Sequence, residues 1–189
     1  MVKKVINETL VYWVAAVVIF IDQYTKYLVR ANLALGQSWN PWPALAPYVR
    51  LLHTRNTGAA FGMFKEASLV FAVIAVIVSV VIVYYAVRLP TGHWWMRIAL
   101  GMQLGGAVGN LIDRVLFNGN VTDFISFTIP VIKYDFAVLN VADASISTGV
   151  ALLIVIMWLD GRAAKRKPAP PVAEPPPDDA PQPASDTTV

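Results

Sequence analysis

The stretch "SLVFAVIAVIVSVVIVYYAV", residues 68–87, decides the class of fold, because it runs for twenty residues without a charge. A helix that crosses a bilayer needs about 20 mostly apolar residues. Three further stretches are mostly apolar, at about 9–29, 94–113 and 138–159. The chain is 57% hydrophobic and 14% charged, whereas soluble domains carry about 25% charged residues. The sequence therefore predicts an integral membrane protein with four transmembrane helices.

Composition also excludes several kinds of chemistry. The 189 residues include no cysteine, so the chain forms no disulfide and has no thiolate nucleophile. With His53 and His93 as the only histidines, a histidine-rich metal site is not expected. The net charge of +3 comes from basic residues at helix ends, which indicates membrane orientation more than nucleic-acid binding. We expect no metal, no cofactor and no nucleic-acid partner.

The basic residues predict the orientation in the membrane. An even number of spans puts both termini on one side. Eight Lys and Arg residues fall on the side of the termini and the short 88–97 turn, against six on the side of the longer links, 30–67 and 114–137. Because short loops rich in Lys and Arg remain in the cytoplasm, both termini are predicted to be cytoplasmic.

The two longer links contain strand-like segments. The first half of "YVRLLHTRNTGAAFGMF" (48–64) and the stretch "VTDFISFTIPVIKY" (121–134) mix β-branched, aromatic and polar residues. They predict a small β-sheet at the outer surface of the bilayer. From residue 163 the chain is rich in proline and lacks aromatic residues. We therefore expect a membrane domain at 1–162 and a disordered cytoplasmic tail at 163–189.

Three carboxylates fall at the same predicted depth. With a rise of about 1.5 Å per residue, Asp22, Asp113 and Asp143 lie about 20–25 Å from the cytoplasmic ends of their helices. The hydrocarbon core is about 30 Å thick, so all three lie in its outer third. An ionisable group in a span costs about 2.5–3.5 kcal/mol and usually faces the protein interior with a function. This region is therefore the predicted functional site.

Helical spacing brings further polar residues to these carboxylates. Asn110, Asp113 and Arg114 stand at i, i+3 and i+4 on one helix, and Asn140 and Asp143 stand at i and i+3 on the next. Asp113 and Arg114 fit a structural ion pair as well as they fit a functional site.

Other features of these helices favour a structural interpretation. Gly101, Gly105 and Gly109 form a ridge of small residues, which indicates close helix packing within the chain more than dimerisation. Asp22 is expected to bond to Lys26 or to nearby backbone.

Five short sequence blocks follow one another along the chain: "DQYTK" (22–26), "NTGAAFG" (56–62), "GGAVGNLIDR" (105–114), "VTDF" (121–124) and "FAVLNVAD" (136–143). In their order and in their positions relative to the spans, they resemble those of the lipoprotein signal peptidase (signal peptidase II) family, over about residues 10–160. It implies an aspartic endopeptidase of the bacterial inner membrane. Such an enzyme cuts diacylglyceryl-modified prolipoproteins before the lipidated cysteine, near the outer leaflet.

The resemblance also implies roles for individual residues. Asp123 and Asp143 map onto the catalytic pair, and Asp22, Lys26 and Asp113 are interpreted as structural support. The implied contacts to substrate, or to the antibiotic globomycin, are Asn56, Gly58, Asn110, Arg114 and Asn140. We expect a monomer whose partners are this substrate, membrane lipids and globomycin.

Two other classes of function remain at this point. A proton-coupled transporter would use Asp22, Asp113 and Asp143 as a relay, but it predicts inverted repeats and acids spread across the membrane. Here no repeat is visible and the acids gather at one interface. A non-catalytic membrane scaffold gives no reason for Asp123 and Asp143.

Overall fold

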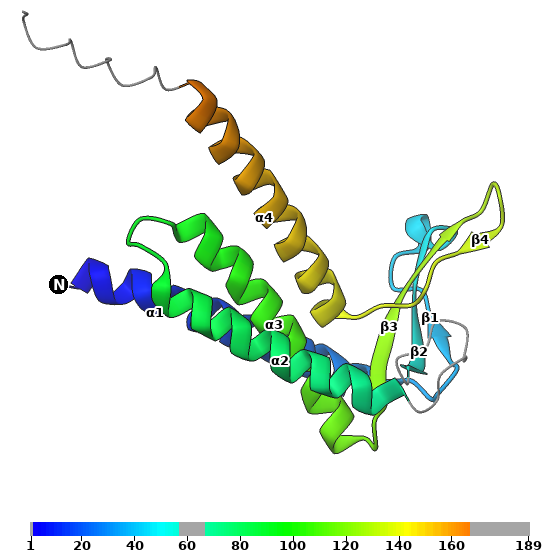
Figure 1. Ribbon diagram of the computed structural model, residues 1–189. Coiled ribbons are helices and arrows are strands. Elements are labelled where there is room, and N and C mark those ends of the chain that lie inside the picture. The colour runs from blue at the N-terminus through cyan, green and yellow to red at the C-terminus, as the bar shows by residue number, and fades with distance from the viewer. Residues whose placement is uncertain (1, 57–66, 167–189) are drawn as a thin grey trace, which may run out of the picture.

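The computed structural model describes residues 2–56 and 67–166 (Figure 1). In these ranges the chain forms four helices, α1 (Val2–Asn32), α2 (Ala67–Arg88), α3 (Trp94–Leu116) and α4 (Val141–Arg166). Four short strands complete the fold, β1 (Ser38–Trp39), β2 (Val49–Asn56), β3 (Val121–Ile129) and β4 (Tyr134–Asp135), with a 3-10 turn at Pro43–Leu45. The predicted set of four helices with a small sheet is confirmed.

The bounds of α1 and α4 differ most from the predicted ones. α1 extends beyond the predicted 9–29 because no glycine or proline interrupts residues 2–32. α4 begins at Val141 rather than at 138, because Leu139 instead forms backbone hydrogen bonds with Ile125 of β3. At its other end α4 continues to Arg166, so residues 163–166 are helical and are not part of a disordered tail. The remainder of the predicted tail, 167–189, lies outside the described residues.

By length and composition, two of the described helices qualify as membrane spans, Ser68–Arg88 and Val141–Arg162. α2 is apolar on all sides, buries Ile82 and Ala86, and leaves most of its large side chains exposed, as a lipid-facing helix does. α1 and α3 carry ionisable side chains within their apolar stretches, which lowers their hydropathy. Among these side chains, Asp22, Lys26 and Asp113 are buried and paired with one another.

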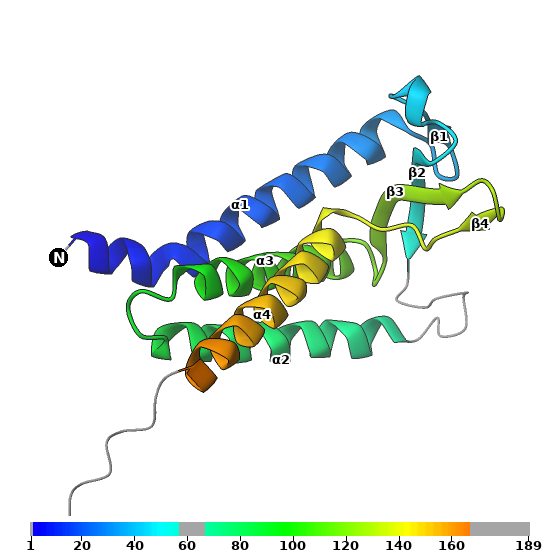
Figure 2. The same cartoon turned by 90° about the horizontal axis from the view of Figure 1, so that it is seen from above.

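α3 is the central helix and packs against the other three (Figure 2). The glycine ridge predicted to pack within the chain faces α1. A Cβ atom at Gly101 would lie 2.7 Å from the carbonyl oxygen of Val11, and one at Gly109 would lie 2.6 Å from the carboxylate of Asp22. Small residues are therefore required where α3 approaches α1.

The antiparallel sheet has the strand order β1-β2-β3-β4 and lies beside the C-terminal end of α1 and the start of α4 (Figure 1). In the β2–β3 pair, Thr54 stands opposite Asp123 and Asn56 opposite Val121. On the other side of β3, the chain leading into α4 pairs through Leu139. β3 is thus held between β2 and the start of α4, which brings residues from three segments together.

Candidate active site

Asp123 lies in β3 and is 1% exposed. Its Oδ1 accepts a hydrogen bond from Nδ2 of Asn140 at 2.6 Å, and its Oδ2 accepts one from Nδ2 of Asn56 at 2.9 Å. Asn56 is a diagonal neighbour across the β2–β3 pair, where side chains on one face of a sheet reach each other. Burial and the nearby charge of Asp143 raise the pKa of Asp123 to about 6, against the opposing effect of the two amides.

Asp143 lies in the first turn of α4 and is held by a reciprocal capping pair. The Oδ1 of Asn140 accepts the backbone N–H of Asp143 at 3.0 Å, and Oδ2 of Asp143 accepts the backbone N–H of Asn140 at 3.2 Å. The remaining oxygen, Oδ1, accepts a hydrogen bond from Nδ2 of Asn110 on α3 at 2.8 Å. The start of the helix therefore determines the orientation of this carboxyl group.

Asn140 joins the two carboxyl groups and is completely buried. Its side-chain NH₂ group donates to Asp123. Its side-chain oxygen accepts the backbone N–H of Asp143, and its own backbone N–H donates to the Asp143 carboxylate. Across the pair, three carboxylate oxygens accept from asparagine side chains and the fourth accepts from a backbone N–H. These donors are neutral, so they orient the pair without cancelling the repulsion between its charges.

A cluster of buried charges supports this site from α1. Asp22 and Lys26 form an ion pair of 2.8 Å, and both side chains are fully buried. The other oxygen of Asp22 accepts the backbone N–H of Ala142 at 2.9 Å, at the start of α4. A carboxylate in that position stabilises a helix N-terminus, so α1 anchors the helix that carries Asp143. The predicted bond between Asp22 and Lys26 is confirmed.

Asp113 belongs to the same cluster. Its Oδ2 accepts the backbone N–H of Thr122 at 2.8 Å and lies 3.7 Å from the ammonium of Lys26. Its Oδ1 lies 3.5 Å from the guanidinium of Arg30. Asp113 thus fixes the beginning of β3, one residue before Asp123, and its cations come from α1. The alternative of a local pair with Arg114 is not the arrangement found.

Sequence reasoning missed two members of this cluster. Gln23 donates to Asp22, to Asp113 and to the carbonyl oxygen of Gly109, at 2.9–3.2 Å. Arg30 also donates to Oγ1 of Thr122 at 2.9 Å. The signal for Arg30 was its spacing of i+4 from Lys26, which places it on the same face of the helix. It was counted as a loop residue because the helix was expected to end at 29.

A cavity of about 450 Å³ opens beside the pair, and Asp143 forms part of its wall. Its polar end also contains Asn56, Asn110 and Arg114. Apolar side chains of α2, α3 and α4 line the rest: Phe71, Ile74, Ala75, Val78, Ala107 and Ile146, together with Gln103 of α3 and Ala137 from the segment before α4. Within the described part of the chain, Nε of Arg114 is buried here without a hydrogen-bond partner. This is a site for an apolar chain with a polar group at one end.

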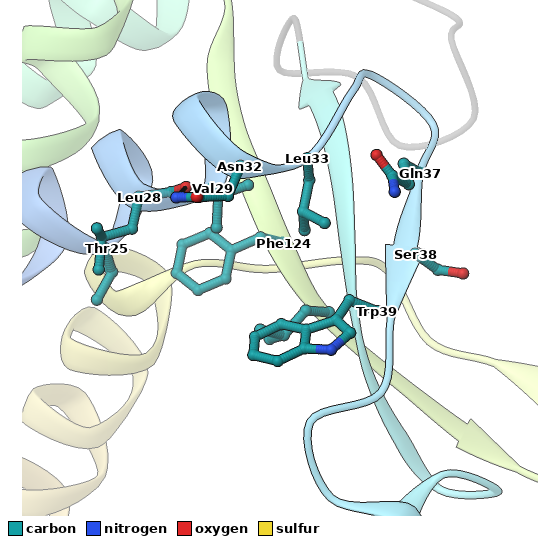
Figure 3. A pocket seen from close by; sticks show the side chains of 10 residues that line it. Thr25, Leu28, Val29, Asn32, Leu33, Gln37, Ser38, Trp39 and Phe124 are labelled. Carbon is teal, nitrogen blue, oxygen red and sulfur yellow. Dashed lines mark hydrogen bonds between the residues drawn. The ribbon is translucent and has the colours of Figure 1, made fainter.

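A larger cavity, of about 620 Å³, lies at the end of α1 (Figure 3). Leu28 and Val29 of α1 line it together with Leu33 just after this helix, Trp39 of β1 and Phe124 of β3. Asp123 and Phe124 are successive residues of one strand, so their side chains point to opposite faces. No titratable side chain lines this cavity among the described residues, and it lies on the face of β3 away from the carboxyl pair. Of these two cavities, only the smaller one has a member of the carboxyl pair in its wall.

The structure gathers most of the predicted site residues. Asp123 and Asp143 are linked through Asn140, and Asn56 and Asn110 each donate to one of the two carboxyl groups. Arg114 lines the same cavity, but none of the hydrogen bonds described above joins it to either carboxyl group. Gly58 lies outside the described residues.

Two solved structures resemble this fold, and both are of bacterial membrane enzymes. The first was determined by the in meso method at 2.3 Å resolution and is 32% identical, with a TM-score of 0.73. The match covers 85% of this chain and 94% of that one. The second, at 1.9 Å resolution, is 33% identical with a TM-score of 0.69, and the match covers 78% of this chain and 91% of that one. The fold is that of a bacterial membrane enzyme.

Sequence comparison narrows the class. A family model for signal peptidase (SPase) II matches residues 14–159. The lipoprotein signal peptidase of Bacillus subtilis strain 168 is 39% identical over 158 residues, which cover 84% of this chain and 99% of the relative. That of Anoxybacillus flavithermus is 41% identical over 156 residues, covering 82% and 89%. The chain belongs to the signal peptidase II family and is an aspartic peptidase. This assignment favours the peptidase over the transporter and the scaffold.

Proposed function

We propose that this protein removes signal peptides from diacylglyceryl-modified prolipoproteins, and that Asp123 and Asp143 are its catalytic pair. The observation that carries the proposal is the arrangement around Asn140. Two carboxyl groups, one on β3 and one on α4, share this one buried residue, beside a cavity that is polar at one end and apolar elsewhere. The relatives named above are lipoprotein signal peptidases, and the substrate class is taken from them.

The pair supplies both functions that peptide hydrolysis needs. Two carboxyl groups with interacting charges hold one proton between them more readily than none, so the pair titrates as a unit. The ionised carboxylate takes a proton from water as the water oxygen attacks the scissile carbonyl carbon. The protonated carboxyl donates a hydrogen bond to the carbonyl oxygen. When the C–N bond breaks, a proton passes to the leaving nitrogen.

The cavity suits the expected substrate. Its apolar walls can receive the lipidated, apolar segment near the cleavage site, where each buried methylene contributes about 0.8 kcal/mol. Asn56 and Arg114 line the polar end, and we propose that they bind peptide carbonyl groups there. We assign Asn110 and Asn140 mainly to holding the carboxyl groups, because their amides are already engaged there. Globomycin would compete for the same cavity.

The proposal includes a position in the membrane. We place all four helices across the bacterial inner membrane, with both termini in the cytoplasm and the carboxyl pair near the outer leaflet. The charges of α1 and α3 are compatible with this placement because Asp22, Lys26 and Asp113 are buried against one another. The sheet then lies at the outer surface. We propose that one copy of the chain suffices, since both carboxylates come from it.

The test is cleavage by purified Asp123→Asn and Asp143→Asn variants. Asparagine preserves the size of the side chain but cannot take a proton from water. Each substitution should lower kcat by about 10²–10⁴-fold or more, because the pair acts as a unit. Folding is checked by size-exclusion profile and globomycin binding, and cleavage is measured on a diacylglyceryl-modified prolipoprotein. Near wild-type turnover in either variant would refute the assignment.

A further inference from the structure

Lys26 is unusual because its ammonium group is completely buried and has three oxygen contacts. It lies 2.8 Å from Asp22 Oδ2, 3.7 Å from Asp113 Oδ2 and 2.9 Å from Oδ1 of Asn110. An ammonium has three N–H donors and no acceptor. The two aspartates alone would balance its charge, so the third contact, to a neutral amide, needs a separate explanation.

That contact, together with one from Asn140, determines which way the Asn110 amide faces. The amide oxygen accepts from Nζ of Lys26 and also from Nδ2 of Asn140, at 2.9 and 3.1 Å. The NH₂ group is thereby left to face Asp143, to which it donates at 2.8 Å. If the amide were flipped, its NH₂ would face an ammonium and a second NH₂ group, and no hydrogen bond could form with either.

We propose that Lys26 is a positioning residue for peptide hydrolysis, which acts by fixing the Asn110 amide so that it can only donate to Asp143. The inference rests on the function proposed above. A flipped amide would present its oxygen to Asp143 and would bond to the protonated carboxyl, in which the proton is no longer available for exchange with water. With the amide fixed, Asp143 accepts two hydrogen bonds, from Asn110 and from the backbone of Asn140. That is the state in which a carboxylate can take a proton from water.

The variant Lys26→Met removes the ammonium and retains an unbranched side chain. It also leaves two buried aspartates without this cation, so a loss of folded protein is expected. The double change Lys26→Met with Asp22→Asn removes the ion pair as a unit, and the oxygen of an asparagine at 22 can still accept the N–H of Ala142. We expect this enzyme to fold and to lose roughly 10–100-fold in kcat with little change in KM, as is typical when a residue that orients a reacting group is removed.

A matched control removes a cation that lies outside this cluster. Arg50→Gln removes a charge that pairs with Asp135 at 3.7 Å, where both side chains are exposed on the sheet. Its kcat per folded molecule should stay within about 2-fold of the wild type, because an exposed ion pair contributes little.

A double-mutant cycle decides whether Lys26 acts through Asn110. Asn110→Ala is measured alone and combined with Lys26→Met/Asp22→Asn, and cleavage is normalised to the monodisperse fraction in size exclusion. If Lys26 works through the amide, the combined enzyme should be no slower than Asn110→Ala alone. Losses in kcat that multiply, or an unchanged kcat in Lys26→Met/Asp22→Asn, would overturn the proposal. Activity retained in Asp123→Asn or Asp143→Asn would instead refute the proposed function, so the two failures are distinguishable.

Discussion

Replacing Asp123 by asparagine should change how the stability of the protein depends on pH. Burial and the charge of Asp143 raise the pKa of Asp123 from 3.8 to about 6. Between these pH values the folded protein retains a proton that the unfolded chain has released. The stabilising contribution of this proton is therefore complete below pH 3.8 and is lost as the pH rises through about 6.

The size of the effect follows from the pKa difference. One pKa unit corresponds to about 1.4 kcal/mol, so wild-type protein should lose about 3 kcal/mol from this group between pH 4 and pH 8. The asparagine variant cannot ionise and should not show this loss. The NH₂ group of the asparagine introduced at 123 would face the donor groups of Asn56 and Asn140, which lowers stability. This loss of stability is the same at every pH. For a chain of this size, about 3 kcal/mol corresponds to a shift in Tm of roughly 6–12 °C.

The assay is thermal unfolding of detergent-solubilised wild type and Asp123→Asn, followed by tryptophan fluorescence from pH 4 to pH 8. The Tm of the variant minus that of the wild type should become more positive by the stated amount as the pH rises. Asp135→Asn, at an exposed position on β4, controls for the loss of any carboxylate near the sheet. Parallel curves for wild type and Asp123→Asn would show that the burial argument is wrong.

Three further predictions follow from the same structure. The kcat/KM for prolipoprotein cleavage should fall as the pH rises through an apparent pKa near 6, because the pair then loses its shared proton; a rate that stays flat from pH 5 to pH 9 would contradict this. Gly109→Ala should lower stability by about 1–3 kcal/mol, because its Cβ would lie 2.6 Å from Asp22 Oδ2, whereas Gly161→Ala, with open space around it, should be neutral or stabilising in the same unfolding assay. A reporter enzyme that is active only in the periplasm should stay inactive when fused after residue 167; an active fusion would overturn the predicted orientation.

The local sequence predicts where the helices lie better than it predicts which other elements they contact. The charge-free stretch at 68–87 led directly to α2, because length and hydropathy alone determine such a helix. The start of α4 was predicted three residues too early, since Leu139 is apolar enough for a helix and its pairing with Ile125 is a long-range contact. The extent of α1 was underestimated because only its apolar stretch was considered.

The site was predictable as a set of residues but not as a network. Asp123 and Asp143 were identified through a family resemblance, and their roles stay a proposal that the arrangement around Asn140 supports. The partner of Asp113 could not be predicted, because its neighbour Arg114 is as suitable a cation as Lys26 or Arg30. The choice depends on which face of α3 packs against α1. The glycine ridge marks the face of α3 that packs closely, but the sequence does not say that α1 is the helix packed against it.

The hydrogen bond between Asp22 and the backbone of Ala142 joins positions 120 residues apart, and this separation has a consequence for biogenesis. At a synthesis rate of about 5–20 residues per second, the start of α4 leaves the ribosome roughly 6–24 s after Asp22. During that interval Asp22 can pair with Lys26, four residues along the same helix. Its hydrogen-bond partner at the start of α4 has not yet been made. Asp143 also arrives only with α4. A nascent chain without α4 therefore lacks Asp143, so on the proposed assignment it has no protease activity toward other membrane proteins.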